Sequence, residues 1–344
     1  MFEAVISICL SLEAGLCRDQ LLPGFEAATV TGCEAALAAR PPDLDGLVTS
    51  DQPRCAPVGE VLSMQEVAPG VFAHRGEVAV PNPRNRGDVS NLGFVIGSKS
   101  VAVIDTGSAR WVGEALWRAI RERTDLPVSH VVLTHMHPDH VMGVSALHDA
   151  GAEIVGHAGL PRALSDRQMN YLESFERLLG AEVFLGTVLT PIDTLVTDTL
   201  ALDLGDRVLD LQTWQSSHTD ADLTVFDRET GTMFTGDLIF HQHTPALDGR
   251  LRGWQTVLHD MSTIEIAQVV PGHGDVSLDW PTAASPMLRY LDVLAADTRQ
   301  ALDAGQRLGQ AIDVIAESEA ENWQLFDEFN PRNATVAYTE LEWE

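Results

Sequence analysis

The sequence predicts an α/β fold built from two similar halves in which strands alternate with helices. The apolar run 131–133 is typical of a buried strand, and a helical pattern begins soon after it at Val141. Up to residue 149 the order is strand, helix, strand, loop, helix, and residues 153–155 resume a strand, which implies parallel strands with helices outside. The order strand, polar residue, helix recurs at Asp237 and at His273. The second half therefore echoes the first.

The chain is long enough for one large domain and an accessory piece. It has 344 residues, of which 45% are apolar, so a full core can form. Residues 40–58 are rich in proline and glycine and are expected to form a linker. We predict a Cys-containing module with a Pro-rich linker over residues 1–58, and the main domain with a helical C-terminal extension over residues 59–344.

All four cysteines lie in the predicted module. They are Cys9, Cys17, Cys33 and Cys55. Their even number and clustering in a small segment favour two disulfides of undetermined pairing and an oxidising compartment. Reduced, buried cysteines in a cytosolic protein are the alternative, and a zinc ribbon is disfavoured because there is no Cys-x-x-Cys pair. No basic residue precedes Arg18, so the start lacks the pattern of a secretory signal, unless one has been removed.

The remaining elements follow from hydrophobic periodicity and turn residues. Expected strands are 67–73, 92–96, 101–104, 208–211, 223–226 and 232–234. Expected helices are one capped by Ser108 with apolar residues from 112 to 120, a long one over 160–179, and helical structure from 285 to about 319. The polar loop 82–88 is of the kind that covers an active site.

The loop after the strand 131–133 concentrates metal-binding side chains. His135, His137, Asp139 and His140 lie within six residues. Neutral imidazole and carboxylate suit zinc and also iron or manganese. A His-rich surface loop is the alternative, but buried His and Asp at this density need a compensating partner, and a metal supplies it most simply.

The charge balance limits the class of partner. With 22 basic and 50 acidic residues the formal net charge is −28, which argues against nucleic acid or an anionic membrane as a partner. Lys99 is the only lysine, so recognition of anions must come from arginine. No apolar run reaches 18 residues, so we expect no simple transmembrane helix. A small-molecule substrate is expected, and the oligomeric state is left open.

Four short motifs resemble, in order along the chain, those of the metallo-β-lactamase fold superfamily. They are His135-x-His137-x-Asp139-His140, Ser216-Ser217-His218-Thr219-Asp220, Phe234-Thr235-Gly236-Asp237 and Val270-Pro271-Gly272-His273-Gly274. The resemblance covers about residues 65–285. It implies a four-layered αββα sandwich, to which the chain adds the small N-terminal module and C-terminal helices.

The resemblance also implies roles for the motif residues. The implied ligands are His135, His137 and His218 for one metal, Asp139, His140 and His273 for a second, and Asp237 as the bridge. Two zinc ions are implied, with iron or manganese as alternatives, and a bridging hydroxide would attack an ester, thioester or related acyl bond. Asp139 could orient that nucleophile, so Asp139 and Asp237 are the expected catalytic residues. Asp105, Thr134 and Thr219 would support the ligands.

Departures from subfamily patterns narrow the chemistry. Lactamases of the cysteine-ligand type need a cysteine in the second half, and this chain has none after Cys55. Flavodiiron proteins have Glu at the position of His137. Thioesterases of the glyoxalase II kind, lactonases, histidine-type lactamases and sulfur dioxygenases remain. A mononuclear iron dioxygenase acting on a persulfide is the alternative enzyme, and a non-catalytic binding protein is disfavoured by the intact ligand set.

The stretch after Asp237 is expected to line the cleft, which makes His241, His243 and Arg252 candidate substrate contacts. Together with the Cys-bearing module, residues 88–94 and the tail 330–333, this stretch resembles the quinoprotein relay system zinc metallohydrolases. That narrower resemblance implies a Gram-negative, periplasmic setting and association with a quinoprotein dehydrogenase system.

Overall fold

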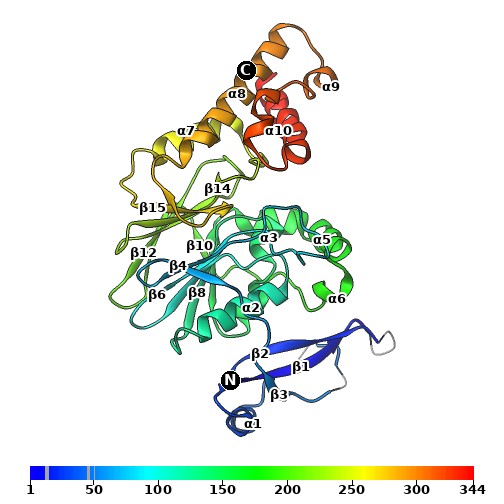
Figure 1. Ribbon diagram of the computed structural model, residues 1–344, viewed down its shortest axis with the longest axis vertical. Helices are drawn as coiled ribbons and strands as arrows, with labels where there is room; N and C mark the ends of the chain where they lie inside the picture. Colours follow the sequence, from blue (N-terminus) through cyan, green and yellow to red (C-terminus); the bar gives the residue numbers. More distant parts are fainter. Residues whose placement is uncertain (12–14, 45–46, 50) are drawn as a thin grey trace.

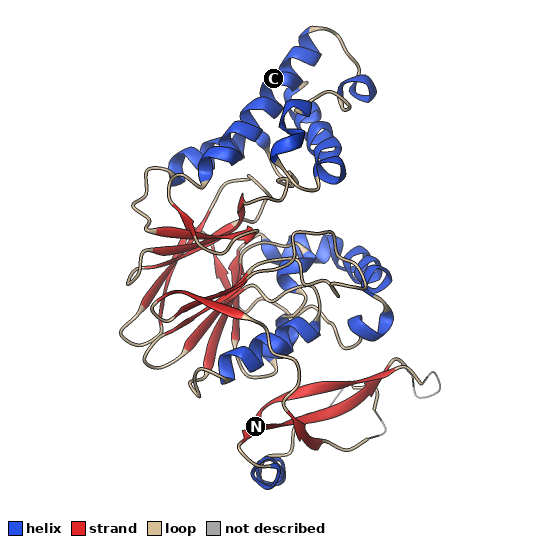
Figure 2. Cartoon of the chain, viewed as in Figure 1, coloured by secondary structure: helices blue, strands red, loops and turns tan. Residues whose placement is uncertain are grey.

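The computed structural model describes residues 1–11, 15–44, 47–49 and 51–344, and it confirms the αββα sandwich. Two sheets face each other, and helices cover the outer face of each (Figure 1). The N-terminal module lies at one end of the long axis and the C-terminal helices at the other (Figure 2). Within the described residues, no helix is long and apolar enough to cross a membrane.

The first half contributes a seven-stranded sheet with the order β10-β9-β8-β7-β6-β5-β4. The strands are β4 (Met64–Ala68), β5 (Val71–His74), β6 (Leu92–Ile96), β7 (Val101–Ile104), β8 (Val128–Leu133), β9 (Glu153–His157) and β10 (Thr194–Val196). Its helices are α2 (Arg110–Arg121), α3 (Pro138–Val141), α4 (Val144–His148), α5 (Leu160–Leu179) and α6 (Ala181–Phe184). Strands β7 to β10 run parallel, as the βαβ order predicts.

The second half contributes a six-stranded sheet with the order β11-β12-β13-β14-β15-β16. The strands are β11 (Thr199–Asp203), β12 (Val208–Thr213), β13 (Leu223–Asp227), β14 (Thr232–Phe240), β15 (Gln268–His273) and β16 (Leu278–Asp279). The helices are α7 (Leu251–Met261), α8 (Ala284–Asp303), α9 (Leu308–Ala311), the 3₁₀ helix η1 (Glu317–Asn322) and α10 (Phe326–Leu341). Of these strands, β14 and β15 pair in parallel.

Side chains of the central strands alternate between the two faces of the sheet, and both faces are buried. In β7, Val101 and Val103 pack under the helices, whereas Ala102 and Ile104 face the second sheet. Successive side chains of a strand point to opposite faces, so a strand that is apolar at every position is buried on both. Across the interface, Phe234 of β14 joins the core between the sheets. The continuous apolar runs of the sequence therefore form the central strands of the sandwich, which are buried on both faces.

The N-terminal module has its own sheet and its own small core. Strands β1 (Phe2–Cys9), β2 (Cys17–Ala27) and β3 (Arg54–Pro57) pair in the order β2-β1-β3, with α1 (Val30–Ala39) packed against them. Ion pairs tie the module to α2: Arg118 Nε lies 2.8 Å from Glu3 Oε2, and Arg18 Nη1 lies 3.0 Å from Glu114 Oε2. The division at residue 58 stays a prediction.

Two disulfides link the four cysteines, Cys9 to Cys17 and Cys33 to Cys55. The first closes the β1–β2 hairpin and the second ties α1 to β3. Titration of unfolded, unreduced protein should therefore find no free thiol, and titration after reduction should find four. Two free thiols before reduction would contradict one of the disulfides, and four would contradict both.

Three local expectations differ from the structure. Residues 67–73 form part of a β4–β5 hairpin rather than one strand, because Gly70 turns the chain with a φ of 70°. Ser108 does not cap α2; the N-cap is Ala109, and the buried Ser108 hydroxyl makes no hydrogen bond within the part of the chain that the structure describes. Residues 54–57, expected to be part of the linker 40–58, instead form the strand β3 of the module, paired with β1.

Candidate metal centre

The predicted ligands meet at the ends of the central strands of both sheets. His135, His137, Asp139 and His140 follow β8 directly, and His273 ends β15. His218 lies in the β12–β13 loop, and Asp237 lies within β14. The backbone approaches closely here: a Cβ added at Gly272 would lie 1.9 Å from Asp237 Oδ1. Glycine before His273 is therefore needed to seat the Asp237 carboxylate.

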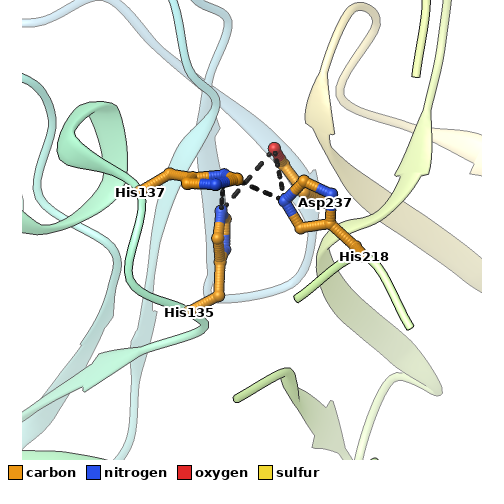
Figure 3. A group of neighbouring side chains, drawn as sticks. All are labelled: His135, His137, His218 and Asp237. Carbon is orange, nitrogen blue, oxygen red and sulfur yellow. Dashed lines mark hydrogen bonds and ion pairs between the residues drawn. The ribbon is translucent and has the colours of Figure 1, made fainter. Parts of the chain in front are cut away.

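One group of ligands converges tightly (Figure 3). His137 Nδ1 lies 3.1 Å from His135 Nε2 and 3.0 Å from His218 Nε2. Asp237 Oδ2 lies 3.6 Å from His135 Nε2 and 3.4 Å from His218 Nε2. Zinc ligands at the corners of a tetrahedron lie about 3.3 Å apart for metal–nitrogen bonds of about 2.0–2.1 Å. These four atoms therefore have the spacing of a zinc site.

A second group shares Asp237 with the first. Asp139, His140 and His273 place one possible ligand atom each within 4.8 Å of the others. His273 Nε2 lies 3.4 Å from Asp139 Oδ2 and 3.4 Å from Asp237 Oδ2, and His140 Nε2 lies 3.2 Å from Asp237 Oδ1. The Asp237 carboxylate therefore stands between two ligand groups, which is the position predicted for a bridge.

Hydrogen bonds fix which nitrogen of each imidazole faces the cluster. Carboxylate and main-chain oxygens accept the outer N–H of four rings: Asp105 from His140 Nδ1 (2.8 Å), Ala246 from His218 Nδ1 (2.5 Å), Val89 from His273 Nδ1 (2.9 Å) and Asp248 from His137 Nε2 (3.3 Å). The fifth, His135 Nδ1, lies 3.0 Å from the Thr134 hydroxyl, which itself donates to Asp105 and so accepts from the ring. All five inward nitrogens therefore present lone pairs, as metal ligands must.

Burial and charge act on the ligand histidines in opposite directions. Burial would lower the pKa of His140 and of His273, but Asp237 and the other nearby carboxylates outweigh it and raise both, so a metal would displace a proton from these two rings. Burial lowers the pKa of His218 to about 3, and burial with the neighbouring His140 lowers the pKa of His135 well below its usual value. Burial would raise the pKa of Asp237, but His273, His140 and His135 outweigh it and hold that pKa well below its usual value. Neutral imidazole and ionised carboxylate are the forms that bind metal.

Two buried polar atoms at the centre have no hydrogen-bond partner among the described residues. They are His140 Nε2 and Asp237 Oδ1. Buried polar groups are nearly always satisfied, so each such atom needs an explanation. Lone-pair nitrogens and carboxylate oxygens that face one another without donors are satisfied together by cations. The residues present therefore fit two divalent metal ions.

The supports of the ligands are partly those expected. Asp105 accepts from the Thr134 amide (2.8 Å) and hydroxyl (2.7 Å) as well as from His140, so it orients two neighbouring parts of the cluster. Thr219 supports the ligands only indirectly, because among the described residues its hydroxyl makes no hydrogen bond to a ligand side chain. Its amide and hydroxyl bind Asp222, which fixes the loop that carries His218.

Asp248 is a support that the sequence did not identify. Its Oδ2 accepts from His137 Nε2 at 3.3 Å, and its Oδ1 accepts from Arg332 Nη2 at 2.9 Å. The hydrogen bond from His137 and the nearby charges lower the pKa of Asp248. Its position in the loop after β14 could have suggested that Asp248 lies near the site. Nothing in the sequence indicated that it would bind His137. Asp248 is therefore the link between a ligand and the C-terminal helix α10.

Replacing Asp248 by asparagine should weaken metal binding about 10- to 100-fold, since outer partners of ligating histidines have effects of that size. Competition with a chromophoric chelator measures the affinity. Asp210→Asn is the matched control, because Asp210 is also paired with one arginine, Arg228, but lies at the surface. Equal affinities in both variants would exclude Asp248 from positioning His137.

A cavity of about 290 Å³ opens over the ligands. His137, Asp139, Asp237 and His273 form its floor. The walls are Ala79, Pro81, Val89, Pro138, Asn170, Tyr171, Ser174, Phe175, Phe240, His243, Ala246, Phe329 and Arg332. Apolar walls with few polar groups are typical of small-molecule sites.

Of the three predicted substrate contacts, only His243 lines this cavity. The Nδ1 of His243 donates to Thr244 O at 2.5 Å, so its Nε2 is an acceptor. His241 does not line it and instead lies 3.6 Å from Asp275. Arg252 does not line it either: α7 begins at Leu251 and turns Arg252 toward Gln255 and Glu344. The structure places Arg332, not Arg252, in the cavity wall.

Comparisons with known proteins agree with this architecture. The family model of the metallo-beta-lactamase superfamily matches residues 85–281. A thioesterase, pkgB of Emericella nidulans, is 27% identical over 194 residues, which are 55% of this chain and 47% of that protein. The chain thus matches about half the length of this curated relative.

Solved structures share the fold at low identity. A metallo-beta-lactamase from Pontibacter korlensis has a TM-score of 0.55 at 19% identity, covering 67% of this chain and 99% of that one. The sec-alkylsulfatase Pisa1 from Pseudomonas sp. has a TM-score of 0.61 at 13% identity, covering 81% and 50%. Since the family model spans more than half of the sequence, the chain belongs to the metallo-beta-lactamase superfamily.

Proposed function

We propose that this protein is a dinuclear zinc hydrolase that cleaves an ester, thioester or related acyl bond. The observation that carries the proposal is the Asp237 carboxylate, which lies between two groups of possible ligands whose histidines all make their outer hydrogen bonds. A mononuclear iron dioxygenase would need only part of this set. The thioesterase relative supports the acyl bond as the target.

The metal ligands, Asp139 and the cavity walls would each have a distinct role in the reaction. Divalent cations held here would lower the pKa of a water molecule and polarise the carbonyl of the substrate. Asp139 lies at the cavity floor and is less buried than His140 and His273, so it can accept a hydrogen bond from the attacking water and orient it. The apolar walls exclude other water from the acyl group. Asp139 and Asp237 are thus the proposed catalytic residues.

Metal content and turnover test the proposal together. Protein purified without added metal should contain about two zinc ions per chain by elemental mass spectrometry. Zinc-loaded protein should hydrolyse members of an ester and thioester panel, and removing the metal with a chelator should abolish that turnover. One iron per chain, with oxygen consumption on a persulfide, would replace this proposal by the dioxygenase. Manganese or iron in both sites with acyl hydrolysis would correct only the metal.

The setting of the enzyme is a separate proposal. Two disulfides are typical of proteins in oxidising compartments, and we propose the periplasm. Association with a quinoprotein dehydrogenase system is proposed on the narrower resemblance of the sequence alone. Pull-down with such a dehydrogenase from a periplasmic extract, followed by binding of the purified pair, tests it.

A further inference from the structure

The wall of the cavity contains a single basic side chain, Arg332, among the described residues that line it. Arg332 lies on α10, in the helical extension beyond the part of the chain that the family model matches. Phe329, one turn earlier on the same helix, lines the cavity as well. The C-terminal extension therefore supplies both an apolar and a cationic part of the site.

The hydrogen bonding of Arg332 is unlike that of an arginine with a structural role. Arg207 shows what such a role looks like here: its side chain is 6% exposed, and it donates to both oxygens of Asp227 and to the carbonyls of Pro69 and Ile96. Arg332 is 62% exposed. In the described part of the chain its one partner is Asp248, through Nη2. Most of its donors remain open to a ligand.

The charge near the cavity mouth also differs from that of the molecule as a whole. The chain carries 50 acidic and 22 basic residues. At the mouth, however, two guanidinium groups face one carboxylate, because Arg167 Nη2 lies 3.9 Å from Asp248 Oδ2 and Arg332 pairs with the other oxygen. Asp248 can neutralise only one of these two guanidinium groups, so one positive charge remains beside the cavity wall, apart from the acidic Asp139 and Asp237 on the floor. That charge can attract an anionic group of the ligand.

The polar and apolar walls suit one class of substrate. Phe175, Phe240 and Phe329 leave room for a compact apolar body in about 290 Å³. The planar guanidinium of Arg332 offers paired N–H groups, which match the two oxygens of a carboxylate. Building on the acyl hydrolase proposed above, we propose that the substrate is a compact acyl ester or thioester whose acyl chain ends in a carboxylate bound by Arg332.

A pair of substrates that differ only in charge tests the proposal. Glutaryl thioesters of a small thiol are compared with the matching carboxamides, and the series is repeated with acyl chains one methylene shorter and longer. For zinc-loaded wild type, kcat/KM should favour the carboxylate by about tenfold or more, since a hydrogen-bonded ion pair contributes that much. In Arg332→Gln this preference should fall to near one.

The measurement is the ratio of kcat/KM for the carboxylate to kcat/KM for the carboxamide. Arg332→Gln also removes a partner of Asp248, but that loss should change kcat/KM for both substrates equally and leave their ratio unchanged. Arg228→Gln is the matched control, since Arg228 likewise pairs with one carboxylate, that of Asp210, far from the cavity. It should keep the wild-type preference. A wild-type preference near one, or a preference retained in Arg332→Gln, would overturn the role of Arg332.

Failure of the acyl hydrolase itself would look different. If no thioester or ester in either series is hydrolysed, the proposed reaction is wrong, and binding decides the remaining question. Calorimetry with glutarate and its monoamide then compares wild type with Arg332→Gln. Tighter binding of glutarate that depends on Arg332 would support the carboxylate site, and equal binding by both proteins would refute it.

Discussion

Asp237→Ala and His137→Ala are each expected to lower metal-dependent turnover by about a thousandfold or more, because a lost ligand removes several kcal/mol of transition-state stabilisation. Asp237 should have the larger effect, since its carboxylate contacts both ligand groups, whereas His137 belongs to one. Metal content should fall toward zero in Asp237→Ala and toward one ion in His137→Ala. Steady-state kinetics and elemental mass spectrometry on the same preparations measure both quantities.

Matched substitutions distinguish loss of the site from general damage. Asp303 and His259 are exposed helix residues, so Asp303→Ala and His259→Ala should keep full metal content and activity. Circular dichroism of the ligand variants should match that of metal-free wild type, since the core between the sheets does not depend on these side chains. Near wild-type turnover in both ligand variants would refute the assignment of the centre.

Local pattern was enough to predict the elements that carry the ligands. The bounds of β6, β7 and α5 are those expected, because each is a short apolar run or a long amphipathic stretch between turn residues. Every predicted metal ligand meets the others in the structure. The ligands lie in or near buried strands, and the burial of each strand fixes where it runs in the sheet. The position of a ligand in the sequence was therefore enough to predict its place in the structure.

The residues around the metal centre could not be predicted in the same way, because their positions depend on contacts between distant parts of the chain. Asp248 and His137 lie 111 residues apart in the sequence, and their contact depends on how the loop after β14 crosses to the other half. Arg252 is nearer in sequence to Asp237 than Arg332 is, yet the start of α7 turns it away while α10 brings Arg332 in. Likewise, the pairing of the cysteines follows from the strand register of the module, which single-sequence periodicity did not show.

Trp254 of α7 should contribute strongly to the stability of the second half. This side chain is fully buried, donates from Nε1 to Leu238 O at 3.1 Å, and packs its ring 5.3 Å from that of His218. Trp254→Ala leaves a large cavity and an unpaired carbonyl, so we expect it to lower the free energy of unfolding by about 3–5 kcal/mol. Urea unfolding followed by near-ultraviolet circular dichroism measures the change.

Trp343→Ala is the control for that substitution, because it removes the same side chain from a position that is 85% exposed. Its effect should stay within about 0.5 kcal/mol, as is usual for surface positions. Both variants are compared free of metal, since an ion bound only to the folded state would add its own stabilisation. Trp254→Ala should also bind zinc more weakly than Trp343→Ala does, because the ring of Trp254 holds His218 in place. A Trp254→Ala protein as stable as wild type would refute this contribution of Trp254 to the second half.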